Sequence, residues 1–198
     1  MEPLIPNGDV DGDGFIDLVG IAKIGVYDKS AAYQVSGKDG TIICSIPNLP
    51  SPVTAITGGG DLNQDGIPDI LASRLRASGD SGAISAGRVY GYDGKDCSLL
   101  FDIDSDLEQQ SGDFGLSIVF AGDVNADGFD DFVVQGRYSG QKYNWMLSGR
   151  TQERLFVLVD QNSIGIQETF TPIPDINEDG IDDLLTEGGI VASGKTGK

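Results

Sequence analysis

The chain has 198 residues, of which 31 are acidic and 13 basic, and its formal charge is −18. This excess of negative charge argues against binding to nucleic acid and against insertion into or binding to anionic membranes, and it favours cations as partners. Histidine is absent, which removes the usual zinc ligand and the usual general base. No apolar run is long enough for a membrane-spanning helix, and the first residues do not read as a signal peptide.

In chain order, four nine-residue segments align without gaps, and we call them the aspartate loops: 9–17, 61–69, 123–131 and 175–183. Their starts lie 52, 62 and 52 residues apart, and a short apolar run follows each loop. Further along each unit comes a second shared element, apolar-x-apolar-x-Gly-Lys/Arg, at 33–38, 90–95, 145–150 and 190–195. Repetition at this period predicts a repeat architecture.

The apolar runs are short, rich in β-branched and aromatic residues, and separated by Gly, Asp and Asn, which is typical of strands and turns. No segment shows sustained helical spacing of apolar residues. A unit of about 50 residues with roughly four short strands has the size of a propeller blade. We therefore predict an all-β, propeller-type array of about four blades in one repeat domain, with approximate units 1–52, 53–110, 111–163 and 164–198.

The spacing of oxygen-bearing side chains in each loop predicts a Ca²⁺ site, because Ca²⁺ takes six to eight oxygen ligands. The side-chain ligands are expected at loop positions 1, 3, 5 and 9: Asp9, Asp11, Asp13 and Asp17; Asp61, Asn63, Asp65 and Asp69; Asp123, Asn125, Asp127 and Asp131; Asp175, Asn177, Asp179 and Asp183. Position 7 is expected to supply a backbone carbonyl while its side chain packs into the core: Phe15, Ile67, Phe129 and Ile181. The sequence thus predicts up to four bound Ca²⁺ ions.

Two further loop positions support this interpretation. Position 6 is always Gly, as a tight turn around an ion requires: Gly14, Gly66, Gly128 and Gly180. Position 2 is always apolar and is expected to face the core: Val10, Leu62, Val124 and Ile176. An EF-hand would need a bidentate acid at position 12, where Gly20, Ala72, Val134 and Thr186 stand. Asp130 and Asp182, at position 8, are expected to be solvated neighbours and not ligands.

Ordinary Asp-Gly turns on an acidic surface are the alternative interpretation of these loops. Four matches in register make that alternative weak, and several carboxylates within one turn repel each other strongly without a cation. A hydrolase that uses loop carboxylates as acid and base is also disfavoured, because catalytic carboxylates form one odd pair and are not repeated four times. We therefore predict that the chain is not an enzyme and has no catalytic residues.

These loops resemble the FG-GAP repeats of integrin α-subunit propellers and their bacterial relatives. The clearest copy runs from Phe114-Gly115 to the Gly122-Asp123 that opens the third loop, and 87–94 resembles the strand that follows in that family. The Phe-Gly element is degenerate in the other units, at 57–60 and 171–174. The resemblance implies a β-propeller with calcium on one rim and a role in adhesion, recognition or assembly outside the cell.

The number of units departs from that family, whose propellers usually have seven blades. Unpaired strand edges invite pairing with another chain. Three arrangements stay open: part of a longer propeller, a closed ring with an irregular seam, and a homo-oligomer in which identical neighbours complete the edges. The last would be a head-to-tail contact that forms a ring or a filament.

The leading functional hypothesis is a calcium-stabilised structural, assembly or adhesion protein that is secreted or at the cell surface. The alternative is a module that recognises a glycan or an extracellular protein on the propeller face. Core packing between blades is expected for Tyr138, Tyr143 and Trp145, with a carbohydrate platform as the alternative. Whether Cys44 and Cys97 form a disulfide is left open: an extracellular setting permits one, but the two positions do not align within the repeat.

Overall fold

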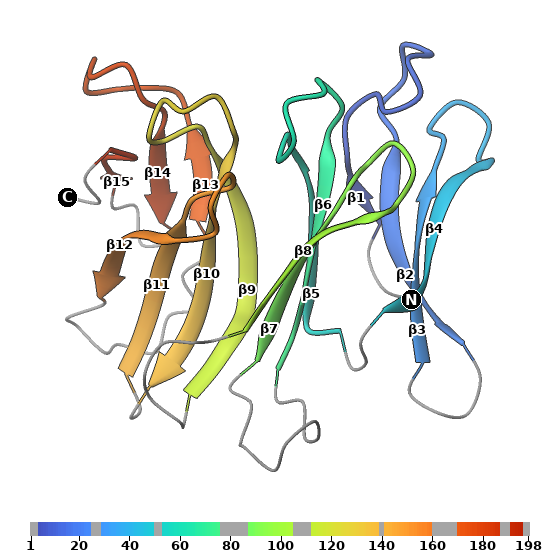
Figure 1. The fold of residues 1–198 in the computed structure, drawn as a ribbon. Helices are drawn as coiled ribbons and strands as arrows, with labels where there is room; N and C mark the ends of the chain where they lie inside the picture. The colour runs from blue at the N-terminus through green and yellow to red at the C-terminus, as the bar shows by residue number, and fades with distance from the viewer. Residues whose placement is uncertain are drawn as a thin grey trace.

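The structure is a computed structural model that describes residues 4–24, 29–49, 53–75, 87–104, 112–138, 141–159, 170–186 and 191–195. These residues form fifteen strands in four separate antiparallel sheets, which confirms the all-β prediction (Figure 1). Among these residues, no helix has the length and apolar character needed to cross a membrane.

Each sheet is a meander in which strands that follow one another in the chain are hydrogen-bonded neighbours. The first sheet contains β1 (Ile5–Pro6), β2 (Leu18–Ile24), β3 (Lys29–Val35) and β4 (Ile42–Leu49). The second contains β5 (Ala55–Gly60), β6 (Asp69–Arg74), β7 (Arg88–Tyr92) and β8 (Leu99–Asp104). The third contains β9 (Gly112–Gly122), β10 (Asp131–Tyr138), β11 (Gln141–Leu147) and β12 (Arg154–Val159). The fourth contains β13 (Phe170–Ile173), β14 (Asp183–Thr186) and β15 (Val191–Ala192).

The aspartate loops join the first two strands of every sheet and lie at the same end of the molecule, the upper end in Figure 1. The Gly-Lys/Arg turns join the third and fourth strands of the first three sheets at that same end. Neighbouring sheets stand side by side, and the first strands β1, β5, β9 and β13 contact one another in that order. The repeat therefore places four similar loops on one edge of a row of sheets.

Three apolar clusters fill the spaces between neighbouring sheets. The residues immediately after each loop explain this packing, because alternate strand residues point to opposite faces. In the second sheet, Ile70 packs against the first sheet, whereas Leu71 packs against the third. Phe132 and Val133 divide in the same way between the second and fourth sheets. Two adjacent apolar residues after a loop thus bury one side chain on each face.

Two of the three aromatic residues expected in the core, Tyr143 and Trp145, lie in the third sheet and pack at its contact with the second. Trp145 is buried with a 7% exposed fraction in the cluster between the second and third sheets. Its ring lies 5.5 Å from that of Phe114 and 5.6 Å from that of Tyr143. Packing of this kind accounts for Trp145 as a core residue. The side chain of Tyr138 lies outside the described part of the structure.

A disulfide joins Cys44 of β4 to Cys97, which lies between β7 and β8, and their Cα atoms are 5.7 Å apart. The bond links the outer part of the first sheet to the second sheet across 53 residues of sequence. The two cysteines occupy different places in their units because one belongs to a strand and the other to a turn of the next sheet. Misalignment within the repeat is therefore no obstacle to pairing between adjacent sheets.

Removal of this disulfide should destabilise the chain. A Cys44→Ser, Cys97→Ser double variant should lose about 2–4 kcal/mol of unfolding free energy, because a cross-link limits the freedom of the unfolded chain. Chemical denaturation followed by tryptophan fluorescence measures the loss. The reduced wild-type protein is the control and should match the double variant. Equal stability of all three proteins would show that the bond contributes nothing.

Candidate metal centre

The four aspartate loops share one hydrogen-bond scheme, which folds each of them back on itself. The carboxylate at position 1 accepts the backbone N–H of position 6, at 2.8 Å for Asp9 and Gly14. The side-chain oxygen at position 3 accepts the N–H of position 5, and the carboxylate at position 5 accepts the N–H of position 7. The same three bonds occur in the other loops, with distances of 2.7–3.1 Å. Positions 1, 3 and 5 are thereby turned toward the inside of each loop.

Position 9 differs from the other ligand positions because its aspartate is buried. The exposed fractions of Asp17, Asp69, Asp131 and Asp183 are 0%, 0%, 0% and 1%. One oxygen of Asp69 accepts the N–H of Leu62 at 2.7 Å, and the other accepts the N–H of Gly94 at 2.8 Å. The equivalent pairs of bonds occur in the first, third and fourth units. Position 9 therefore ties the start of its loop to the Gly-Lys/Arg turn of the same sheet.

The turn residue that donates this N–H must be glycine, because the turn lies very close to the backbone of the loop. A Cβ atom on Gly94 would overlap the backbone carbonyl oxygen of Pro68, at loop position 8. The same overlap would occur in every unit, at Gly37, Gly94, Gly149 and Gly194. This glycine recurs in the sequence of every unit, but its role at the site was not predicted. Its separation from position 9 varies between 11 and 25 residues, so sequence spacing alone does not join the two elements.

Backbone conformation at two loop positions also follows the repeat. Position 6 is left-handed in every loop, with φ between 77° and 90°, as its invariant glycine predicts. Position 4 is left-handed as well, although three of its four residues carry side chains: Gln64, Ala126 and Glu178, with φ of 58–63°. Left-handed residues other than glycine are uncommon and cost free energy, so the rest of each loop must hold them in place.

In the first loop, three carboxylates are close enough to hold one metal ion. One oxygen from each of Asp9, Asp11 and Asp17 lies within 4.8 Å of the others. Two oxygens on opposite sides of a Ca²⁺ ion stand about 5 Å apart, since each Ca–O distance is about 2.3–2.6 Å. The other three loops have Asn at position 3, whose amide oxygen points inward in the same way.

Two expectations about apolar loop positions are wrong, one at Phe15 and one at Ile176. Phe15, at position 7, has an exposed fraction of 52% and does not pack into a core; Lys38 lies over its ring, 5.7 Å from the centroid. In the third loop, Arg150 lies over Phe129 in the same way, at 5.4 Å. Ile176, at position 2, is 60% exposed, whereas its three equivalents are 4–6% exposed. Basic residues of the turns thus lie over position 7 in the first and third loops, and position 2 is buried only where another sheet follows.

The second and third loops are joined directly through Asp130, which was expected to be solvated. Asp130 is half-buried, and its carboxylate accepts the backbone N–H of Asp61 at 2.7 Å. The backbone N–H of Asp130 donates in return to the carbonyl of Asp61 at 2.9 Å. Position 8 of one loop therefore fixes position 1 of the preceding loop. Asp182, the equivalent in the fourth loop, is exposed as expected.

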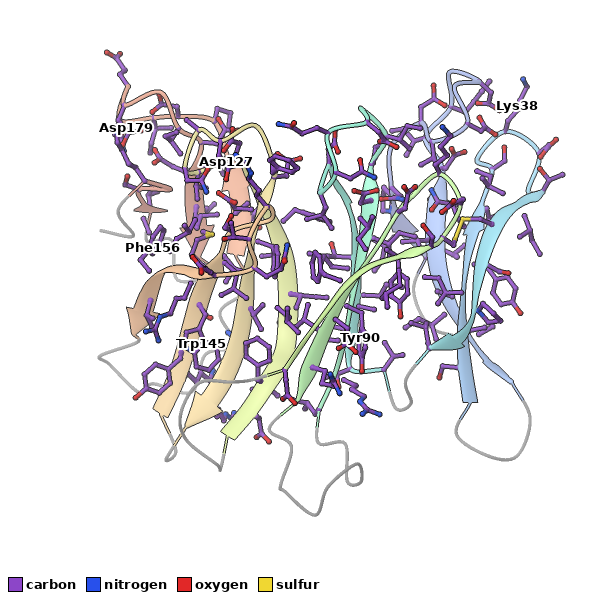
Figure 2. The ribbon with its side chains drawn as sticks, viewed as in Figure 1. Lys38, Tyr90, Asp127, Trp145, Phe156 and Asp179 are labelled. Atoms are coloured by element: carbon purple, nitrogen blue, oxygen red, sulfur yellow. A yellow bond between two sulfur atoms is a disulfide. The ribbon has the colours of Figure 1, made fainter. Side chains whose placement is uncertain are left out.

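Burial opposes ionisation of two of the position-9 aspartates, Asp69 and Asp131. It raises the pKa of Asp69 to about 7 and that of Asp131 to about 6, against the lowering effect of two N–H donors on each. Neighbouring carboxylates raise both values further, those of Asp93 and Asp61 for Asp69 and those of Asp127 and Asp123 for Asp131. A cation among the loop oxygens would favour the ionised form, because opposite charge stabilises it. The electrostatics of these loops are therefore suited to a bound cation. Figure 2 shows two loop aspartates, Asp127 and Asp179, at this end of the molecule.

Comparison with known proteins shows the fold but no family. No family model matches the chain. Among solved structures, it is similar to the Bacillus licheniformis rhamnogalacturonan lyase PL11, with a TM-score of 0.57, 17% identity, and coverage of 100% of this chain and 42% of that one. It is also similar to the rhamnogalacturonan lyase YesW (TM-score 0.56, 15% identity, coverage 98% and 42%) and the exotype rhamnogalacturonan lyase YesX (0.57, 15%, 99% and 41%). The chain thus spans about two fifths of the length of these proteins.

Replacement of a position-9 aspartate should destabilise the fold even in the presence of a chelator. Asp69→Asn keeps one acceptor oxygen but turns an N–H₂ group toward a backbone N–H, so we expect a loss of about 1–3 kcal/mol in unfolding free energy. Asp65→Asn, at an exposed position of the same loop, is the matched control and should lose less than about 0.5 kcal/mol. Denaturant melts in chelator measure both. Equal losses would contradict a structural role for the buried carboxylate.

Proposed function

We propose that the chain is a calcium-stabilised structural or interaction module that works outside the cell, with its four sheets arranged as blades of a propeller-type array. The observation that carries this proposal is the inward-facing oxygen set of the first loop, repeated with the same hydrogen bonds in the other three. The contacts between the first strands of neighbouring sheets support the propeller arrangement. FG-GAP membership stays a prediction from the loop sequences.

The calcium ions would act through stability. The loops connect the first two strands of their sheets, and position 9 connects each loop to a turn of the same sheet. An ion that binds only the folded state adds its binding free energy to folding. Extracellular calcium modules have dissociation constants of about 10⁻⁴–10⁻³ M. The disulfide between Cys44 and Cys97 is compatible with such a location, because disulfides persist mainly in oxidising compartments.

Recognition of a polysaccharide is a second candidate, favoured by the likeness of the whole chain to part of three rhamnogalacturonan lyases. At 15–17% identity this likeness concerns the fold. The acidic clusters recur in every unit, so we assign them to the repeat and propose no catalytic role for them. Binding of rhamnogalacturonan to the folded, calcium-loaded chain, measured by affinity electrophoresis, would favour the second candidate over a purely structural role.

Chelation should lower the melting temperature sharply. At calcium concentrations about ten to a hundred times the dissociation constant, each site should add roughly 1–3 kcal/mol to stability. Thermal melts in calcium and in chelator measure the difference, and magnesium serves as the control because it demands a stricter octahedral site. Identical melting temperatures in calcium and in chelator would show that the loops are acidic turns.

Each loop should account for one ion. Asp9→Asn replaces the position-1 carboxylate of the first loop and should reduce the number of bound Ca²⁺ ions by one, as measured by isothermal titration calorimetry. Asp39→Asn removes an exposed acid outside the loops that bonds only to Thr41 among the contacts described, and should leave that number unchanged. A stoichiometry that falls equally in both variants, or in neither, would contradict the assignment.

A further inference from the structure

The second unit differs from the others at the residue that precedes its turn glycine. Serine stands at this place in three units, at Ser36, Ser148 and Ser193, whereas the second unit has Asp93. Each serine hydroxyl accepts a backbone N–H of its own turn. Oδ1 of Asp93 does the same and accepts the N–H of Lys95 at 2.7 Å. The four residues therefore share one task, which is to close the turn.

Asp93 has a second oxygen, and this oxygen reaches the second aspartate loop. Its Oδ2 accepts an N–H of the Asn63 side-chain amide at 3.0 Å. Asn63 is the ligand predicted at loop position 3, and its amide oxygen accepts the backbone N–H of Asp65 inside the loop at 2.9 Å. The two ends of one amide thus have different partners, and Asp93 binds the end that cannot be a metal ligand. A serine hydroxyl that closes the turn has no second oxygen for this contact.

The orientation of Asn63 decides whether the loop offers an oxygen at position 3. An amide side chain presents a carbonyl oxygen on one side and an N–H₂ group on the other, and only the oxygen can bind Ca²⁺. An ionised carboxylate accepts hydrogen bonds and donates none, so Asp93 pairs with the N–H₂ group and leaves the oxygen toward the inside of the loop. Groups that bind the far side of a metal ligand commonly orient it and tune the affinity of the site.

The turn holds Asp93 in place for this contact. The backbone carbonyl of Asp93 accepts the N–H of Cys97 at 2.8 Å, and Cys97 belongs to the disulfide with the first sheet. On the other side, Gly94 donates its N–H to Asp69 at loop position 9, at 2.8 Å. The carboxylate therefore reaches Asn63 from a turn that is bonded both to the loop and to the neighbouring sheet.

Position 3 is served differently in the first and fourth loops. The first loop has Asp11, whose two oxygens are both possible ligands, so that no amide has to be oriented. In the fourth loop the N–H₂ group of Asn177 donates to Asp183, at position 9 of the same loop, at 3.1 Å. There the turn residue Ser193 donates its hydroxyl to Asp179, at position 5, at 3.1 Å. A turn carboxylate that binds the position-3 amide is thus a feature of the second unit.

We propose that Asp93 is a positioning residue for calcium in the second loop. It holds the amide of Asn63 with the oxygen toward the ion and thereby raises the calcium affinity of that loop. Asp93 acts through Asn63 and is not counted among the ligands. This inference rests on the proposed calcium function, because it concerns the affinity of one of the four proposed sites.

Nuclear magnetic resonance of the chain, isotope-labelled at its glycine nitrogens, tests the role of Asp93 loop by loop. Every loop has a glycine at position 6 whose N–H donates to the position-1 aspartate and so reports on its own loop. Calcium is titrated into the wild-type chain and into Asp93→Ser, which has the turn residue of the other three units. Gly66 should saturate at a calcium concentration roughly tenfold higher or more in the variant. The other position-6 glycines should keep their wild-type midpoints.

Two controls separate the orientation of the amide from the loss of charge. Asp96→Asn removes an exposed acid of the same turn, whose carboxylate accepts the N–H of Ser98, and should leave the Gly66 midpoint unchanged. Asn63→Asp places a carboxylate at position 3, as in the first loop, and leaves no amide to orient. In that background Asp93→Ser should no longer weaken binding, because two neighbouring carboxylates repel each other and share no N–H.

The outcomes distinguish this inference from the calcium proposal. Equal weakening by Asp93→Ser in both backgrounds would show an effect of charge alone and would overturn the inference. An unchanged Gly66 midpoint in Asp93→Ser would also overturn it, and the calcium proposal would stand as long as the four glycine signals respond to calcium. If no position-6 glycine of the wild-type chain responds, the calcium proposal fails and this inference fails with it.

Discussion

The arrangement of every unit depends on one buried carboxylate, the aspartate at loop position 9. Each of its oxygens accepts a backbone N–H, one from position 2 of the same loop and one from the glycine of the Gly-Lys/Arg turn. Those two bonds hold the loop against the turn so closely that a side chain on the glycine would not fit. Burial of an acid is costly without compensation, and the raised pKa values of Asp69 and Asp131 express that cost. The fold and the candidate metal centre therefore use the same side chain.

This double use explains why the loops repeat so faithfully while the strands vary. Strand residues need only be apolar and of suitable size, since cores tolerate many such exchanges. A loop position that must face a cation, accept an N–H or adopt a left-handed backbone allows few residue types. Asp130 adds a contact between two units, because its hydrogen bonds to Asp61 join the third loop to the second. The second and third loops are thus joined directly and are not isolated turns.

The all-β fold and the cluster of Asp9, Asp11 and Asp17 were predictable from sequence, because short apolar runs alternate with turn residues and because the aspartates recur at fixed spacing in the loop. The role of the turn glycine was not, since it depends on a contact between two segments that only the folded sheet brings together. The left-handed backbone at position 4 was hidden for a similar reason, as Gln64, Ala126 and Glu178 give no local signal of it. Whether Phe15 and Ile176 are exposed depends on which sheet lies beside each loop. The alternation of polar and apolar residues within a loop does not predict that neighbouring sheet.

The most direct test of the central claim is a crystal structure of the chain grown in calcium, with anomalous scattering used to locate the ions. The account predicts one ion in each loop, bound by the oxygens of positions 1, 3, 5 and 9 and the carbonyl of position 7, at about 2.3–2.6 Å. Loops that keep their hydrogen bonds but hold no ion at saturating calcium would contradict it, and would make the buried aspartates purely structural.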